Sequence, residues 1–195
     1  MARLRILLMT ERHERALLLE QTLASAHHQV SAVIRPDDDL LLYVQQAHPD
    51  ALIIDLIEPT PDILLGLRRL DEQQPLAVVV FVDRSDSQII RMAVKAGVSA
   101  YVVDGFQPAR VVPVLEAACA RFQEFQALRG ERDRAQTKLA ERKSIERAKG
   151  ILMRRRALAE EPAYRLLRKM AMDRGRQLAE VAENIITAEE VLAQG

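Results

Sequence analysis

Residues Asp50–Asp62 read "DALIIDLIEPTPD", a short apolar run that reaches a carboxylate, Asp55, and is then interrupted by two prolines. Ala, Leu and Ile without polar alternation are typical of a strand that is covered on both faces. A helical pattern, Ile63–Leu70, follows Pro61. The stretch therefore predicts a buried strand with a carboxylate at its end and a helix behind it.

Similar apolar runs recur along the first part of the chain, at Leu4–Met9, Val30–Ile34, Leu52–Ile54, Ala77–Val82 and Ala100–Val103. Helical patterns lie between them, at Glu14–Ala26, Leu40–Ala47, Ile63–Leu70 and Ser87–Ala96. Alternating strands and helices predict an α/β fold, here a five-stranded parallel doubly wound (flavodoxin-like) sheet. Binding or chemistry is then expected at the carboxyl ends of the strands.

A long helix is predicted after the sheet. Beyond Pro113 the chain contains no helix breaker before Gly130 and no proline before Pro162. A helix from Pro108 to Arg155 would measure about 70 Å at 1.5 Å per residue. Its apolar residues follow a loose 3/4 spacing, which predicts coiled-coil pairing of two copies. Arg132 and Arg142 interrupt a strict heptad, so the pairing is expected to be partial.

The last part of the chain predicts a small three-helix bundle. Its first helix ends near Arg156, and the second begins at Glu160-Glu161-Pro162, with acids and proline in the first turn. The second ends near Gly175, a helix-terminating residue, and a third follows to about Leu192. We predict a sheet domain at residues 1–120, a coiled-coil linker helix at 121–137 and a helical domain at 138–195.

Charge is divided unevenly although the whole chain is neutral. Residues 1–120 carry 11 Lys and Arg against 16 Asp and Glu, whereas residues 121–195 carry 17 against 12. A basic second half favours a polyanionic partner. The apolar runs are shorter than the roughly 20 residues of a membrane span, and the N-terminus does not resemble a signal peptide. We expect a cytoplasmic protein without membrane contact.

Catalytic and metal-binding patterns are not found. The single cysteine excludes an intramolecular disulfide and a cysteine zinc cluster, and the four histidines are scattered. We predict no enzyme activity and no cofactor.

Asp55 and the order of the predicted elements over residues 3–120 resemble the receiver domains of response regulators, in which such an aspartate accepts a phosphoryl group. The resemblance implies acids after the first strand that hold magnesium, a Thr or Ser after the fourth and a Lys after the fifth. This chain has Thr10-Glu11, Val82 and Asp104 at those places.

Two interpretations of the sheet domain stay open. In one, Asp55 with Glu11, and Asp83 as a further candidate, still binds magnesium or a phosphoryl group. In the other, the domain is a pseudo-receiver used for protein contacts, because the groups that would stabilise phosphate are absent. We favour the pseudo-receiver.

The segment "SIERAKGILMRRRALAEEPAYRLLRKMAMDRGRQLAEVAENII", from Ser144 on, resembles the ANTAR domain, an RNA-binding antitermination module of bacterial regulators. The resemblance covers residues 135–193 and is carried by many spaced positions, including Ile145, Ala148-Lys149-Gly150, Leu152-Met153, Ala163-Tyr164, Leu167-Arg168, Ala171-Met172, Leu178 and Ala182. Together with the degenerate receiver, the architecture is most similar to the nitrate/nitrite-assimilation (NasT-like) type.

Side-chain chemistry gives these positions expected roles. Small side chains that allow close helix packing are Ala148, Ala163, Ala171 and Ala182. Candidate RNA contacts are Lys149, Arg154 and Arg168, because their cations attract phosphates. Tyr164 could stack on an unpaired base or fill the bundle core.

The resemblance implies an antiterminator that binds hairpins in nascent leader RNA, often two adjacent stem-loops, and prevents terminator formation. A homodimer would gain avidity for paired hairpins, and for the nitrate type a ligand-sensing partner protein controls the regulator. The alternatives are a phosphorylation-controlled DNA-binding response regulator and a protein-interaction adaptor. A helix-turn-helix pattern with a tight glycine turn is not visible, and an adaptor would leave the basic half unexplained.

Overall fold

The structure, a computed structural model, describes residues 3–105 and 107–193 of the 195-residue chain. The chain forms two compact units, Met1–Gln126 and Ala127–Gly195.

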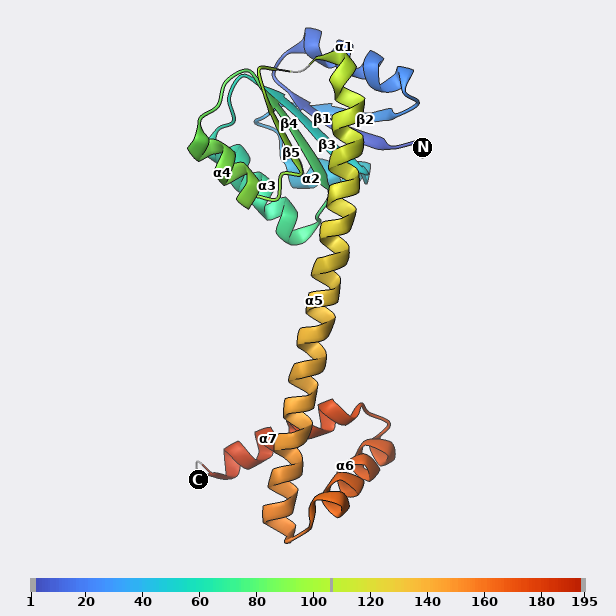
Figure 1. Ribbon diagram of the computed structural model, residues 1–195, viewed down its shortest axis with the longest axis vertical. Helices are drawn as coiled ribbons and strands as arrows, with labels where there is room; N and C mark the ends of the chain where they lie inside the picture. The colour runs from blue at the N-terminus through green and yellow to red at the C-terminus, as the bar shows by residue number, and fades with distance from the viewer. Residues whose placement is uncertain (1–2, 106, 194–195) are drawn as a thin grey trace. The chain divides into compact units, whose positions relative to one another are not determined.

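The first unit is a parallel sheet between helices (Figure 1). Its strands are β1 Arg5–Thr10, β2 Gln29–Ile34, β3 Ala51–Leu56, β4 Ala77–Val82 and β5 Ala100–Val103. Its helices are α1 His13–Ser25, α2 Leu40–Ala47, α3 Pro61–Gln73, α4 Ser87–Lys95 and the beginning of α5 Pro108–Arg156. The strand order is β2-β1-β3-β4-β5 with every pairing parallel, which confirms the predicted doubly wound fold.

Two apolar cores lie on the two faces of the sheet. Every residue of β3 and β4 is buried, which explains why neither strand alternates with polar residues. Alternate side chains enter different cores: Leu52 and Ile54 pack with α2, α3 and α4, whereas Ile53 packs with α1 and α5. Asp55 continues this alternation and is the buried carboxylate at the end of β3.

Side-chain caps fix where several helices begin. Thr60 Oγ1 accepts a hydrogen bond from the Ile63 N–H (3.4 Å), and Pro61 occupies the first turn, so α3 begins two residues before the predicted Ile63. Asp86 Oδ1 accepts from the N–H groups of Gln88 (2.7 Å) and Ile89 (2.8 Å) at the start of α4. The caps set the helix bounds that hydrophobic spacing alone leaves open.

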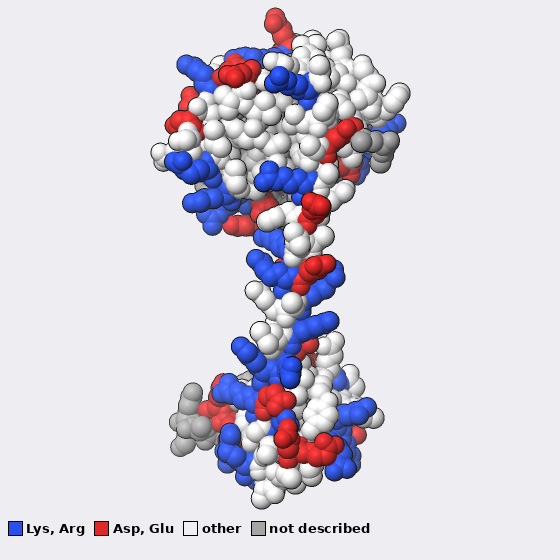
Figure 2. All heavy atoms as spheres, viewed as in Figure 1, with Lys and Arg blue, Asp and Glu red and all other residues white. Residues whose placement is uncertain are grey.

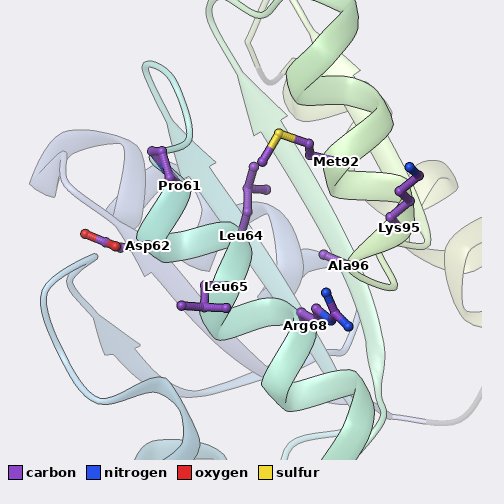
Figure 3. Close-up of a pocket in the computed structure, with 8 residues that line it drawn as sticks. All are labelled: Pro61, Asp62, Leu64, Leu65, Arg68, Met92, Lys95 and Ala96. Atoms are coloured by element: carbon purple, nitrogen blue, oxygen red, sulfur yellow. The ribbon is translucent and has the colours of Figure 1, made fainter.

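A groove of about 390 Å³ lies between α3 and α4 (Figure 3). Its lining is Pro61, Asp62, Leu64, Leu65, Arg68, Met92, Lys95 and Ala96. Leu65 and Met92 are exposed, and Arg68 donates to Glu72 at 3.1 Å. The lining holds no histidine, cysteine or hydroxyl group, so the groove is an apolar surface with a charged rim and no catalytic constellation.

The second unit is a three-helix bundle formed by the end of α5, α6 Glu160–Arg174 and α7 Leu178–Ala193. Its core is Ala148, Ile151, Leu152, Ala163, Leu167, Ala171, Val181, Ala182 and Ile186. Helix α6 ends at Gly175, whose φ of 60° lies in the left-handed region that glycine adopts without strain. Four core residues are alanines, Ala148, Ala163, Ala171 and Ala182, whose small side chains allow close packing.

The predicted long helix is confirmed as the single helix α5 of 49 residues. All its residues from Glu131 to Ala140 are exposed, and basic side chains are frequent along this stretch (Figure 2). Among the residues described, no helix combines the length and the apolar character that crossing a membrane requires.

Candidate nucleic-acid interface and the Asp55 cluster

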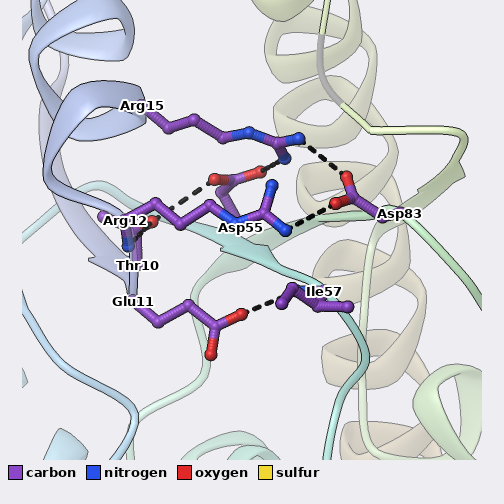
Figure 4. A network of polar contacts seen from close by, with 7 residues as sticks. All are labelled: Thr10, Glu11, Arg12, Arg15, Asp55, Ile57 and Asp83. Atoms are coloured by element: carbon purple, nitrogen blue, oxygen red, sulfur yellow. Dashed lines mark hydrogen bonds and ion pairs between the residues drawn. The ribbon is translucent and has the colours of Figure 1, made fainter.

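Asp55 lies in a network of charged side chains at the carboxyl end of the sheet (Figure 4). Arg15, in the first turn of α1, donates from Nη1 to Asp55 Oδ1 at 2.9 Å. Thr10, at the end of β1, donates its hydroxyl to Asp55 Oδ2 at 3.3 Å. Both oxygens of this fully buried carboxylate therefore already have hydrogen-bond donors within the chain.

The same network includes Asp83, the residue after β4. Arg15 Nη2 donates to Asp83 Oδ1 at 2.9 Å, and Arg12 Nη2 lies 2.8 Å from Asp83 Oδ2. The Arg15 guanidinium thus bridges two carboxylates from two strand ends, and Arg12 adds a second positive charge. We call Thr10, Arg12, Arg15, Asp55 and Asp83 the Asp55 cluster.

The two carboxylates of the cluster respond differently to their surroundings. Burial raises the pKa of Asp55 and outweighs the hydrogen bonds from Arg15 and Thr10. At Asp83 burial acts in the same upward direction, but the hydrogen bonds from Arg15 and Arg12 prevail and lower its pKa. Burial likewise opposes the charge of Arg15, and its bonds to Asp83 and Asp55 overcome that effect and raise its pKa. Asp83 is therefore the carboxylate that the arginines hold most firmly in its charged form.

The residues around Asp55 do not fit the magnesium site that a receiver resemblance implies. Glu11 points to the backbone instead, where its Oε1 accepts from the Ile57 N–H at 3.0 Å (Figure 4). Within residues 3–105 and 107–193 no group of three or more His, Cys, Asp or Glu side chains could hold a metal ion. Val82 is buried and Asp104 is exposed, so neither supplies a phosphate-binding side chain beside Asp55.

In the second unit, three basic side chains hold the helices together. Arg147 donates to Glu190 at 2.8 Å, and Arg155 donates to both carboxylate oxygens of Glu189 at 3.2 and 2.9 Å, so α5 is tied to α7. Lys149 Nζ lies 2.6 Å from Glu146 and 2.8 Å from Glu160, which ties α5 to the start of α6.

Lys149 is the least exposed of the predicted RNA-binding side chains, at 11%. Its hydrogen bonds to Glu146 and Glu160 raise the pKa of Lys149, and the same contact lowers the pKa of Glu160. The amine is a permanent cation with two carboxylate partners. It could reach a phosphate only by leaving both of them.

Arg154, Arg168 and Tyr164 are exposed. Tyr164 and Arg168 are four residues apart on α6 and share one face of the helix. Tyr164 is 38% exposed and lies outside the buried core. The Arg154 side chain lies over Gly150, one turn earlier on α5. Its Nη1 would be 3.8 Å from a Cβ atom added at that glycine. Within the described part of the chain, neither Arg154 nor Arg168 makes an ion pair.

Other side chains that the sequence did not single out lie on this face of α6. Met172 is 73% exposed one turn beyond Arg168, and Arg165 and Lys169 are exposed beside the same stripe. The signal was present in the spacing, because residues 164, 168 and 172 repeat every four positions. We define the α6 face as Tyr164, Arg165, Arg168, Lys169 and Met172.

Comparisons with known proteins agree with this division of the chain. Residues 133–186 match the ANTAR domain family. The transcriptional regulatory protein PdtaR of Mycobacterium tuberculosis is 32% identical over 138 residues, which cover 71% of this chain and 67% of PdtaR. The nitrate regulatory protein of Klebsiella oxytoca is 42% identical over 64 residues, 33% of this chain and 16% of that protein.

Solved structures support the fold of the first unit. A response regulator from Thermotoga maritima aligns with a TM-score of 0.52 and 17% identity, covering 61% of this chain and 99% of that one. The receiver domain of a diguanylate cyclase from Desulfovibrio desulfuricans G20 aligns with a TM-score of 0.53 and 15% identity, covering 63% and 98%. The two relatives found by sequence, PdtaR and the nitrate regulatory protein, are named as regulators and not as enzymes. A receiver-like sheet, a long helix and a C-terminal ANTAR domain identify this chain as a member of the ANTAR-domain family of transcriptional regulators.

Proposed function

We propose that this protein is a transcription antiterminator of the bacterial cytoplasm that binds hairpins in nascent leader RNA and prevents terminator formation. The C-terminal bundle binds the RNA, and the receiver-like unit receives the signal through protein contacts. Membership of the ANTAR family supports the RNA-binding role. Similarity to a protein named for nitrate regulation supports nitrate or nitrite assimilation genes as the target.

One observation carries the proposal: the basic side chains of the bundle fall into two sets. The first set forms ion pairs with glutamates and consists of Arg147, Lys149, Arg155, Arg165 and Arg176. Five others are exposed and, within the described residues, have no ion pair: Arg154, Arg156, Arg168, Lys169 and Arg174. Basic side chains that form no ion pair within the bundle are available to bind RNA phosphates.

The α6 face adds a group suited to RNA rather than to any polyanion. Tyr164 presents a partly exposed ring next to Arg168, and unpaired loop bases stack on such rings while arginine contacts the adjacent phosphate or base edge. We therefore assign direct RNA contacts to Tyr164, Arg154 and Arg168. Lys149 is assigned the role of positioning α6 against α5.

A homodimer through α5 is part of the proposal. Leu128, Ala135 and Leu139 are exposed and follow the 7- and 4-residue steps of a coiled-coil seam. Two bundles in one dimer would bind two adjacent hairpins with increased avidity. A separate ligand-sensing protein would control access of the regulator to RNA.

The test compares a leader hairpin with a duplex DNA of equal length over a salt series. Arg168→Ala should weaken hairpin binding and reduce the salt slope by about 0.7–0.9 for each phosphate contact that is lost. Arg147→Ala, which removes the same charge from a side chain paired with Glu190, is the matched control and should leave the slope unchanged.

Equal affinity for random duplex DNA and for the hairpin would contradict the proposal and favour the DNA-binding alternative. Equal slopes for the two variants would remove Arg168 from the RNA contact and place the interface away from the α6 face.

A further inference from the structure

We infer that Arg15 is the built-in counter-charge of the Asp55 cluster and stands in for the divalent cation that a receiver site would bind. The receiver-like unit therefore holds its strand-end carboxylates together without a metal ion. This inference concerns the first unit alone and does not depend on RNA binding.

The charges of the cluster already balance. A carboxylate as buried as Asp55, at 0% exposure, must be paired or lose its charge. Arg15 and Arg12 bring two positive charges to the two negative charges of Asp55 and Asp83. A divalent cation added to this set would leave an excess of two positive charges, unless it displaced a guanidinium.

The space of the cluster is also taken. The main chain of Gly105 closes one side, because a Cβ atom there would lie 2.9 Å from Asp83 Oδ1 and 3.7 Å from Nη1 and Nη2 of Arg15. Gly105 has a φ of 73°, and its N–H donates to the Val82 carbonyl at 2.7 Å, so the backbone is held in this position. A hydrated cation cannot enter beside Arg15 unless these groups move.

Local sequence places the arginines where they are needed. Arg12 is the residue before α1, and Arg15 follows three positions later, so both side chains leave the same side of the first turn. Both arginines pair with Asp83, which follows β4, and Arg15 also pairs with Asp55 on β3. Ion pairs thereby anchor the start of α1 to two strand ends that are 40 and 68 positions away from Arg15 in the chain.

The experiment titrates the full-length protein with MnCl2, followed by isothermal calorimetry and by the EPR signal of free Mn²⁺, and repeats thermal unfolding with MgCl2. The variants are Arg15→Met, Asp55→Asn, the double variant Arg15→Met/Asp55→Asn, and Arg68→Met. Arg68 lies in the same unit and pairs with Glu72 on the surface, so it controls for the loss of one arginine.

Wild type and Arg68→Met should show no Mn²⁺ binding and no shift of the unfolding midpoint with Mg²⁺. Arg15→Met leaves Asp55 without a positive partner and Asp83 with Arg12 alone, so the variant should be less stable without a cation, bind Mn²⁺ at least about tenfold more tightly than wild type and be stabilised by Mg²⁺. The double variant removes the buried charge as well. It should recover stability and lose the response to both ions.

Mn²⁺ binding by the wild type that Asp55→Asn abolishes would overturn the inference, because the cation would then enter despite Arg15. A folded Arg15→Met variant without a cation response would overturn it too. If Arg15→Met does not fold alone, folding of the double variant still supports the counter-charge role, whereas failure of both overturns it.

Discussion

The tight alanine core of the bundle predicts that Ala148→Leu destabilises the C-terminal unit. Ala148 is 0% exposed and packs in one core with Ala163, Ala171 and Ala182, all at 5% or less. Leucine adds three carbon atoms where no surface is open, and such overpacking costs about 1–3 kcal/mol.

The unit is small enough for this loss to be decisive. It comprises about 70 residues, so its total free energy of unfolding is about 3.5–10 kcal/mol. A loss of about 2 kcal/mol lowers the Tm of a unit of this size by about 8–16 °C. RNA affinity should fall only as the variant unfolds and should return to the wild-type value at low temperature.

Thermal unfolding followed by far-UV circular dichroism, with hydrogen exchange of α6 peptides to identify the unit, measures the effect. Ala188→Leu is the matched control, because Ala188 is exposed on α7 and alanine and leucine have similar helix propensities. A stability of Ala148→Leu within about 0.5 kcal/mol of wild type, or an equal loss in the control, would refute the close-packing argument.

Four further outcomes are expected. Asp55→Asn should leave induced antitermination largely intact, since the carboxylate is occupied by Arg15; a stable acyl phosphate on Asp55 that changes RNA affinity would contradict this. The lowered pKa of Asp83 stabilises the folded protein above the unfolded pKa of about 3.9, and this stabilisation is lost as pH falls through the lower folded value. Asp83→Asn should therefore reduce the dependence of the free energy of unfolding on pH in this acidic range. An unchanged pH dependence would exclude Asp83 as its cause. Lys149→Met should destabilise the bundle, whereas Arg168→Ala should weaken hairpin binding at unchanged Tm. Thermal unfolding measures the first effect and filter binding the second, and the reverse pattern would exchange the roles assigned to the two residues. Leu139→Lys should shift the dimer towards monomer in sedimentation equilibrium; an unaltered dimer would place the interface elsewhere.

The fold was readable from the sequence because its signals are local. Apolar runs flanked by polar residues coincide with the five strands. The segment after Pro113 that lacks helix breakers lies within the long helix α5. Helix starts were less accurate where a cap decides them. Thr60 and Pro61 begin α3 before the first periodic apolar residue, Ile63.

The Asp55 cluster was only half predictable. Asp55 was found because it ends a predicted strand and because the order of the elements around it resembles that of receiver domains. Arg12 and Arg15 look like solvated charges at a helix start, and only the parallel register that pairs Thr10 with Asp55 brings them to that carboxylate. The partners of Lys149 could not be read from the sequence either, because Glu146 and Glu160 lie three positions before it and eleven after it and only the fold brings both to its amine. RNA contact by Lys149 stays a prediction.

The pairing of Arg15 with Asp55 also restricts how this regulator can change over generations. Replacing the arginine alone strands a buried negative charge, and replacing the aspartate alone leaves Arg15 with one carboxylate fewer. A phosphoryl group on Asp55 would have to displace Arg15, and Val82 and Asp104 offer neither a hydroxyl nor an amine to hold it. Substitutions at positions 15 and 55 should therefore be non-additive, and loss of Arg15 should be harmful only while Asp55 keeps its charge.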